Sequence, residues 1–218
     1  MFSLESFYSE YETDIKDLAI KGRRFRLLVP RSLDRFVDPQ DIFHDFPLWS
    51  KLWEASLVLA DYLAGITADP QERILEIGCG LGLVGVVTSS FGHKVTMTEY
   101  NPDALNFARA NTEINLPAVR SNLEICKLDW NHPRLDGTFD RIIGSEILYS
   151  EKDYGPLMEL FKAYLRPGGE IILTEGVRKT SMGFFREMSG ILEIRAEKRL
   201  FRSKEQEIVV LLARMKFR

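Results

Sequence analysis

The feature that most constrains this chain is an apolar run that turns into closely spaced glycines, RILEIGCGLGLVG at residues 73–85. The run begins with the composition of a buried strand, and the pattern after the glycines is typical of a helix. Gly80, Gly82 and Gly85 match the G-x-G-x-x-G pattern that brings a backbone turn close to a nucleotide. A tight turn without a ligand can use the same glycines, so the surrounding segments must decide what the motif does.

Strand-like and helix-like segments alternate along the chain after these glycines. The predicted strands are 73–77, 94–98, 123–128, 139–145 and 170–176, and the predicted helices are 82–91, 102–114, 156–165 and 181–189. This alternation predicts βαβ units and a Rossmann-like, doubly wound, mostly parallel sheet. Two further strand-like runs, 192–201 and 206–215, are separated only by RSKE, a gap that allows an antiparallel hairpin and no parallel crossover. We therefore expect an α/β fold that ends in an antiparallel hairpin.

The residues before the glycine motif predict an N-terminal addition to one main domain. Spaced apolar residues over 4–19 predict an amphipathic helix, and RRFRLLVP and LDRFVD then predict two short strands or an extended arm. Another helix is predicted over 48–63, ending near Gly65. A chain of 218 residues can bury one substantial core. We expect an N-terminal helix and arm at 1–45 and a single domain at 46–218.

The composition limits the partners of the chain. With 29 basic and 32 acidic residues, a net charge of −3 gives no general attraction to nucleic acids or anionic membranes. No apolar run approaches the ~18 residues that cross a bilayer, and the N-terminus lacks the pattern of a signal peptide. Cys79 and Cys126 are too few for a disulfide framework, and the cysteines and histidines show no metal-ligand spacing. We expect a cytoplasmic protein without a metal or a membrane partner, and no feature of the sequence specifies an oligomeric state.

Acidic residues at the ends of the predicted strands indicate the ligand. Glu76 precedes the glycines, where its carboxylate would repel the pyrophosphate that a dinucleotide places at a helix N-terminus. S-adenosylmethionine (SAM) reverses this requirement, because it carries a cationic sulfonium and an ammonium group and no phosphate. Glu99 follows the second strand, about 20 residues beyond the glycines, which is the usual position for binding ribose hydroxyls. Asp129 and Trp130 follow the third strand and offer an acceptor for an adenine amino group and an apolar wall, so together the acids favour SAM over NAD.

These motifs carry a resemblance to a known family. With Glu76-x-Gly78-x-Gly80-x-Gly82, Glu99, Asp129 and the segment LRPGGEIILTE, the chain resembles the class I, seven-β-strand, SAM-dependent methyltransferases. The resemblance runs from about residue 48 to the C-terminus. It implies that SAM is the methyl donor and S-adenosylhomocysteine (SAH) the product. It also implies a cofactor pocket formed by Trp53, Glu76, Gly78, Gly80, Gly82, Glu99, Tyr100, Asp129, Trp130 and Ser145.

The end of the fourth predicted strand indicates one group within this family. FDRIIGSEILYS contains Glu146 and Tyr149 at the spacing D/E-x-x-Y/F, which is similar to the signature of the seven-β-strand protein-lysine methyltransferases. PLWSKLWEASLVLADYL is similar to the tryptophan-bearing helix of those enzymes, in which the residue corresponding to Trp53 contributes to the SAM pocket. Glu146 stands where many members have Asp, and the arm before Phe46 matches no segment of the family. The resemblance implies catalytic roles for Glu146 and Tyr149 and a lysine side chain of a protein as the acceptor.

The expected chemistry is an in-line displacement, for which the protein supplies alignment and a polar channel rather than a metal or a covalent residue. A lysine amine, with a reference pKa of about 10.4, must first lose its proton. We hypothesise that Glu146 orients the incoming amine by accepting its hydrogen bonds. Tyr149 would form an aromatic channel whose low polarity favours the neutral amine.

Ordinary structural roles are also open to several of these residues. Glu99 and Glu146 could cap the following helices, Asp129 could be an ordinary loop acid, and the rings of Trp53 and Tyr149 could belong to the core. The alternative functions are a methyltransferase for a small molecule or RNA, a non-catalytic SAM-binding module, and an NAD-dependent oxidoreductase. Nucleic acid is disfavoured because the fourth strand lacks the Asn/Asp-Pro-Pro-Tyr/Phe form and because the net charge is acidic.

Overall fold

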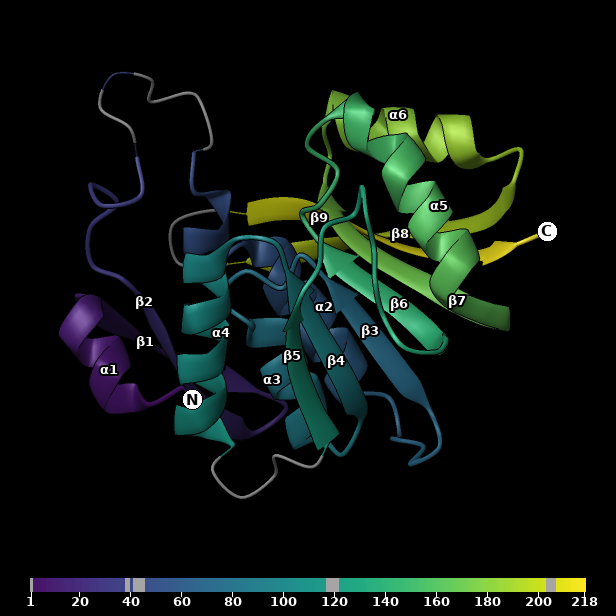
Figure 1. Ribbon diagram of the computed structural model, residues 1–218. Helices are drawn as coiled ribbons and strands as arrows, with labels where there is room; N and C mark the ends of the chain where they lie inside the picture. Colours follow the sequence, from purple (N-terminus) through teal and green to yellow (C-terminus); the bar gives the residue numbers. More distant parts are fainter. Residues whose placement is uncertain (1, 38–39, 41–45, 117–121, 203–206) are drawn as a thin grey trace.

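A mostly parallel sheet organises the fold. In the computed structural model, which describes residues 2–37, 40, 46–116, 122–202 and 207–218, this sheet has seven strands. Their spatial order is β5 (Leu123–Lys127), β4 (Lys94–Glu99), β3 (Arg73–Ile77), β6 (Phe139–Ser145), β7 (Leu165–Gly176), β9 (Glu207–Phe217) and β8 (Leu192–Arg202). The first five run parallel, and β9 pairs antiparallel with both β7 and β8 (Figure 1). The predicted α/β sheet with a C-terminal antiparallel hairpin is confirmed, although the predicted first residue of the last strand, Gln206, lies outside the described residues.

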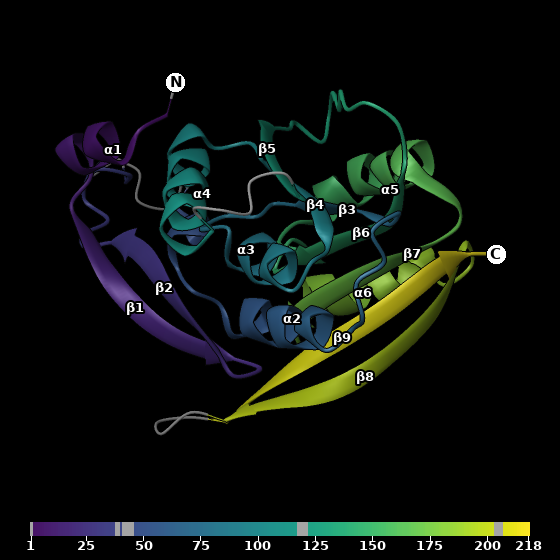
Figure 2. The same cartoon turned by 90° about the horizontal axis from the view of Figure 1, so that it is seen from below.

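Helices cover both faces of the sheet (Figure 2). One face carries α2 (Glu54–Ala64), α3 (Leu83–Ser90) and α4 (Pro102–Asn115), and the other carries α5 (Tyr154–Tyr164), which follows the short 3-10 helix η3 (Glu151–Asp153), and α6 (Lys179–Met188). Side chains alternate between the two faces, because Ile74 of β3 packs in the core under α2 and α3 while Leu75 and Ile77 pack in the core under α5. A strand buried on both faces can be apolar at successive positions, which explains the continuous apolar run before the glycines.

The N-terminal elements lie outside α4 (Figures 1 and 2). They are α1 (Leu4–Glu10), β1 (Thr13–Ile20) and β2 (Arg23–Pro30), with β1 and β2 paired antiparallel. Phe7 of α1 packs edge-on against Phe107 of α4 with ring centroids 5.0 Å apart, and Asn111 of α4 accepts from the backbone N–H of Leu28 in β2 at 2.6 Å. The N-terminal elements therefore share a hydrophobic core with the main sheet, while the division into 1–45 and 46–218 stays a prediction.

Two N-terminal predictions are wrong. The helix predicted over 4–19 ends at Glu10, because residues 13–20 form a strand instead. Lys21 and Gly22, with φ of 47° and 79°, make the two-residue turn that joins β1 to β2, and this turn fixes the hairpin register. Strand β2 is confirmed at RRFRLLVP, but residues 33–37 of LDRFVD form turns rather than a strand, and Asp38 lies outside the described residues.

The tryptophan-bearing helix is shorter than the prediction over 48–63. The segment begins as a 3-10 helix, η1 (Leu48–Ser50), continues through three non-helical residues, and becomes α2 only at Glu54. Trp53 is the N-cap residue of α2 in an extended conformation, and its indole N–H donates to the Leu48 carbonyl at 2.8 Å. This break matters for the site, because the Trp53 ring now lies at the start of the helix instead of on its side.

Candidate active site

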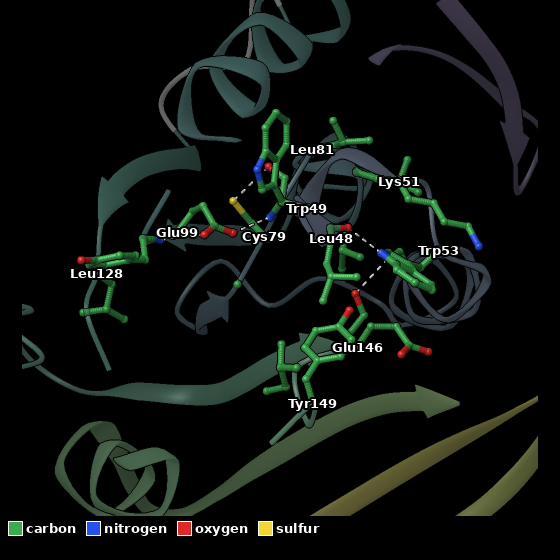
Figure 3. Close-up of a pocket in the computed structure, with 18 of the residues that line it drawn as sticks. Leu48, Trp49, Lys51, Trp53, Cys79, Leu81, Glu99, Leu128, Glu146 and Tyr149 are labelled. Atoms are coloured by element: carbon green, nitrogen blue, oxygen red, sulfur yellow. Dashed lines mark hydrogen bonds between the residues drawn. The ribbon is translucent and has the colours of Figure 1, made fainter. Parts of the chain in front are cut away.

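A cavity of about 480 Å³ opens at the carboxyl ends of the parallel strands. Ligands of open α/β sheets bind at this edge, and the volume is within the range of small-molecule sites. Glu99 and Leu128 lie towards one end of the cavity, and Trp53 and Tyr149 lie towards the other (Figure 3). Its lining includes the predicted site residues Trp53, Gly78, Gly80, Glu99, Tyr100, Asp129, Trp130, Ser145, Glu146 and Tyr149, whereas Glu76 and Gly82 lie outside it.

The glycine turn after β3 forms one wall of the cavity. Gly78 has a φ of 63°, and a Cβ at this position would lie 3.1 Å from Ile147 Cγ2 and 3.4 Å from the Trp130 ring. Gly85, one turn into α3, has no room for a side chain either, because its Cβ would come within 2.2 Å of Met97 Sδ. Gly78 therefore keeps the cavity open, and Gly85 allows α3 to approach the sheet.

Glu99, at the end of β4, joins the glycine turn to the next helix. Its carboxylate accepts from the backbone N–H groups of Gly80 at 3.0 Å, Tyr100 at 2.8 Å and Asn101 at 3.1 Å. The N-cap of α4 is Asn101, whose side chain accepts from the first-turn N–H groups. Glu99 thus fixes the turn and lines the cavity, while the helix is capped by another residue.

Asp129 and Tyr100 flank the same end of the cavity. Asp129 Oδ1 accepts from the backbone N–H of Asn131 at 2.9 Å and from its side-chain amide at 3.1 Å, and these bonds hold the pKa of Asp129 below its ordinary value. Tyr100 is 61% exposed, and the Lys127 ammonium lies 4.9 Å from its ring centroid. This end therefore presents a carboxylate and an aromatic face to solvent.

Glu76 is placed beneath the turn rather than in the cavity. The residue is 2% exposed, and a Cβ on Gly85 would lie 2.6 Å from its Oε2. Among the described residues Oε2 has no hydrogen-bond partner, and burial raises the pKa of Glu76 to about 8. The sequence predicted a charged Glu76 carboxylate near the ligand, whereas in the structure this acid lies against α3. Gly82, with a φ of 80°, is the N-cap residue of that helix.

The opposite end of the cavity is built around Glu146, which follows β6. Glu146 is a non-glycine residue with a positive φ of 52°, in the left-handed region that side chains rarely adopt. Its Oε1 accepts from the Gly176 N–H at 2.8 Å, and its Oε2 pairs with the Arg178 guanidinium. Burial raises the pKa of Glu146, and Arg178 opposes that rise. The carboxylate is held by the last residue of β7 and by Arg178, which follows that strand, and it does not cap a following helix.

Tyr149 and Trp53 form an aromatic pair beside Glu146 (Figure 3). Their ring centroids are 6.4 Å apart, and the Lys51 ammonium lies 4.3 Å from the Trp53 ring. Burial, followed by the nearby Glu146 carboxylate, raises the pKa of the Tyr149 phenol. Ser145 Oγ lies 3.0 Å from Ser56 Oγ of α2 on the same wall. These side chains make a partly apolar passage with one acidic group.

Several residues at the site were missed from the sequence. The lining also includes Phe46, Leu48, Trp49, Lys51, Ser56, Leu128 and Asn131. Glu175 and Arg178 lie outside the lining but contact Glu146 or its neighbours. The rule that picked out acids at strand ends would have found Glu175 near the end of β7, whereas Arg178 carries no comparable signal.

Two further properties concern metals and membranes. Among the described residues, no group of three or more His, Cys, Asp and Glu side chains could hold a metal ion. Within the same residues, every helix is too short or too polar to span a membrane.

Comparison with known proteins identifies a family and a fold. Residues 48–190 match a family described as lysine methyltransferase. A protein N-lysine methyltransferase of Danio rerio, METTL21A, is 34% identical over 56% of this chain and 57% of that protein. The EEF1A lysine methyltransferase 3 of Mus musculus is 29% identical over 59% of this chain and 56% of that protein, so the chain spans little more than half the length of these relatives. Among solved structures, TYW2 of P. horikoshii superposes with a TM-score of 0.58 at 16% identity, covering 93% of this chain and 71% of that chain, which shows a shared fold.

Proposed function

Because the chain belongs to the lysine methyltransferase family, we propose that it transfers a methyl group from SAM to the side-chain amine of a lysine in a protein. One observation carries this proposal. One cavity is lined both by Glu99 and Asp129 and by Glu146 and Tyr149, and Figure 3 places Glu99 apart from Glu146 and Tyr149. The Glu99 end suits a nucleoside, and the Glu146 end suits a cationic or neutral amine.

The residues at the Glu99 end fit the nucleoside and amino-acid parts of SAM. The carboxylates of Glu99 and Asp129 have acceptor capacity for hydroxyl and amino groups, since each oxygen can accept more than one hydrogen bond. Gly78 leaves open the space that a Cβ would fill, and Trp130 supplies an apolar face there. When bound, SAM supplies a methyl group on a cationic sulfonium. Glu76 lies outside the lining, so we assign it an indirect part in cofactor binding, through the packing of α3 on the turn.

The residues at the other end prepare the acceptor. Glu146 can accept a hydrogen bond from the lysine amine in addition to the bond from Gly176, and this would orient the lone pair of the nitrogen. The rings of Trp53 and Tyr149 line this end with apolar surface, which lowers the cost of keeping the amine neutral. Glu146 also attracts the ammonium form, so we assign it orientation of the amine and leave proton loss to the desolvating aromatic walls.

The same proposal includes a protein substrate, weak attraction for nucleic acid and a cytoplasmic location. The names of the relatives, which specify protein lysines, support a protein substrate. Arg195, Arg199 and Arg202 of the C-terminal hairpin each pair with a glutamate of that hairpin, which weakens their attraction for nucleic acid. Cys79 and Cys126 are free thiols, which supports a reducing cytoplasmic location.

Calorimetric titration with SAM, SAH and NAD tests the cofactor assignment. We expect SAM and SAH to bind, and affinity to fall by at least about tenfold in Glu99→Ala, because charged hydrogen bonds to a ligand contribute about 1.5 to 3 kcal/mol. The matched control is Glu124→Ala, an exposed acid on the neighbouring strand, which should keep affinity within about twofold. Binding of NAD alone, or equal affinity in the Glu99 variant, would contradict the proposal.

A further inference from the structure

The segment 174–178, which comprises the end of β7 and the two residues after it, contacts the D/E-x-x-Y/F motif. Gly176 N–H donates to Glu146, and Ile147 N–H donates to Glu175 Oε1 at 2.8 Å. Glu146 N–H donates in turn to the Thr174 carbonyl at 2.9 Å. These bonds connect the two segments at successive positions, so the position of Glu146 depends on residues 174–176.

Arg178 is the one side chain of this segment that touches both ends of the motif within the described residues. Its guanidinium pairs with Glu146 Oε2 and lies 2.9 Å from Glu175 Oε2. The same guanidinium lies 4.9 Å from the centroid of the Tyr149 ring. The backbone is fixed too, because Arg178 is the N-cap residue of α6 and its N–H donates to Ser181 Oγ at 3.1 Å. Arg178 is therefore a rigid link between the acid and the aromatic residue.

The acidic groups around Glu146 disfavour its ionised form, and Arg178 opposes this effect. Glu175 is fully buried, and burial together with Glu146 raises the pKa of Glu175 to about 8. Glu54 of α2 adds a further repulsion, and Tyr149 faces the same carboxylate. Arg178 is the principal cation that opposes these effects on Glu146. Glu146 and Glu175 thus share one guanidinium, and without it both would favour the protonated form.

We propose that Arg178, anchored by Glu175, is a positioning residue that keeps Glu146 ionised and aimed at the acceptor end of the cavity. The proposal rests on the function proposed above, because it assigns Arg178 a part in preparing the site for a lysine. Arg178 and Glu175 lie outside the cavity lining, so they act through Glu146 and Tyr149 rather than on SAM. An ionised Glu146 accepts hydrogen bonds on both oxygens, whereas a protonated one presents a donor to the incoming amine.

The direct test is carboxyl ¹³C NMR titration of protein labelled with [¹³C]glutamate. Because coupled acids titrate as a pair, the signals of Glu146 and Glu175 are identified together by their loss in Glu146→Gln and Glu175→Gln. In Arg178→Met we expect the titration of the pair to move up by about one pH unit or more, as for a carboxylate that loses an adjacent cation. Arg178→Lys should recover part of the shift, since a point charge cannot contact both acids with the geometry of a guanidinium.

The chain provides a matched control at the other end of the same strand. Arg141 of β6 also lies between two glutamates, Glu72 and Glu170, and is far from the cavity lining. Arg141→Met should leave the Glu146 and Glu175 titration unchanged. If Arg178→Met does not fold, as judged by circular dichroism, Arg178→Gln serves instead, because it removes the charge and keeps a hydrogen-bond donor.

The outcomes separate this inference from the proposed function. SAH affinity should stay within about twofold in Arg178→Met, whereas transfer of labelled methyl to lysate proteins should fall and its acid limb should move to higher pH. An unchanged titration of the pair, or an Arg178→Met enzyme with an unchanged pH profile, would overturn the role of Arg178. Failure of the wild-type protein to bind SAH would instead overturn the proposed function, and the NMR shift would still report on the ion pair.

Discussion

Both ends of β6 place an arginine between glutamates, and the two clusters differ in depth and in charge balance. At the amino end, Arg141 lies 2.8 Å from Glu72 and 4.0 Å from Glu170, and Glu170 also pairs with Arg214 at 2.7 Å. The side chains of Glu72 and Glu170 keep 16% and 12% of their exposure. This cluster has an arginine for each acid and some contact with water.

At the carboxyl end, Arg178 alone serves Glu146 and Glu175 within the described residues, and the Glu175 side chain has no exposure. The backbone of Glu146 is also in the left-handed region, which costs about 1 kcal/mol for a residue with a side chain. The second carboxyl group must be balanced by a proton or by a cationic substrate. Similar residues therefore have different roles at the two ends of β6. At the amino end, Arg141 and its glutamates stabilise the fold. At the carboxyl end, Arg178 holds two acids in an arrangement that is unfavourable for stability but suited to an amine substrate.

The largest expected effect concerns Glu76, a buried acid at the carboxyl end that pairs with no arginine in the described part of the chain. Because burial raises its pKa to about 8 in the folded protein, the folded state keeps a proton that the unfolded state loses above about pH 4.5. The contribution of this group to stability should therefore fall by roughly 4 kcal/mol between pH 5 and pH 9, with most of the fall complete by about pH 8. Urea unfolding of the ligand-free protein at pH 5 to 9 should show a fall that is smaller by this amount in Glu76→Gln. If the free energy of unfolding fell equally with pH in the wild type and in Glu76→Gln, Glu76 would not be a buried group with a raised pKa.

Glu146→Gln should have the next largest effect. The amide keeps the shape of the side chain but loses the charge and one acceptor, so methyl transfer should fall by about ten- to a hundredfold. SAH affinity should change by less than about twofold, as measured by calorimetry. Glu72→Gln, the equivalent change in the Arg141 cluster, should leave transfer unaffected. Unchanged turnover in Glu146→Gln would remove Glu146 from the mechanism.

Arg141→Met examines the other side of the comparison. It should lower the free energy of unfolding by about 1 to 2 kcal/mol, because Glu72 and Glu170 are partly buried and lose a shared cation. Methyl transfer at saturating SAM should stay within about twofold. A large loss of activity in this variant, without a loss of stability, would show that the two ends of β6 are not separate in function.

Tyr149→Phe should have the smallest effect. The ring supplies the apolar wall beside Trp53, and the hydroxyl is not required for that role. We expect transfer rates within about twofold for Tyr149→Phe and about a tenfold decrease for Tyr149→Ala, measured in parallel with the same labelled SAM. A severe loss in Tyr149→Phe would instead assign the hydroxyl a part in proton transfer.

Much of the fold was predictable, because β3 to β9 carry strong local patterns. The alternation of strands and helices, and the short RSKE connection, were enough to predict the parallel sheet and its antiparallel end. The N-terminal region was harder, since β1 exposes most of its side chains and its apolar residues fit helical spacing equally well. The decisive local signal was Lys21-Gly22, a turn whose positive φ values join two strands.

The site was predictable where chemistry lies at a strand end and less so where it depends on tertiary contacts. Glu99 ends β4, Asp129 and Glu146 come just after β5 and β6, and the fold brings all three to one cavity. Glu76 shows the limit of that rule, because alternation along β3 turns its side chain towards α3. Arg178 follows β7 by two residues, and its contact with Glu146 spans a distance in sequence that no local pattern encodes.

The central claim is that this cavity moves a methyl group from SAM to a lysine. The most direct measurement is transfer of tritiated methyl from SAM to lysate proteins by the purified protein, followed by acid hydrolysis and separation of the labelled amino acids. The account predicts label in ε-methyllysine, reduced in Glu146→Gln and in Glu99→Ala but retained in Glu124→Ala. Label in another amino acid or in nucleic acid, or no label despite SAM binding, would contradict it.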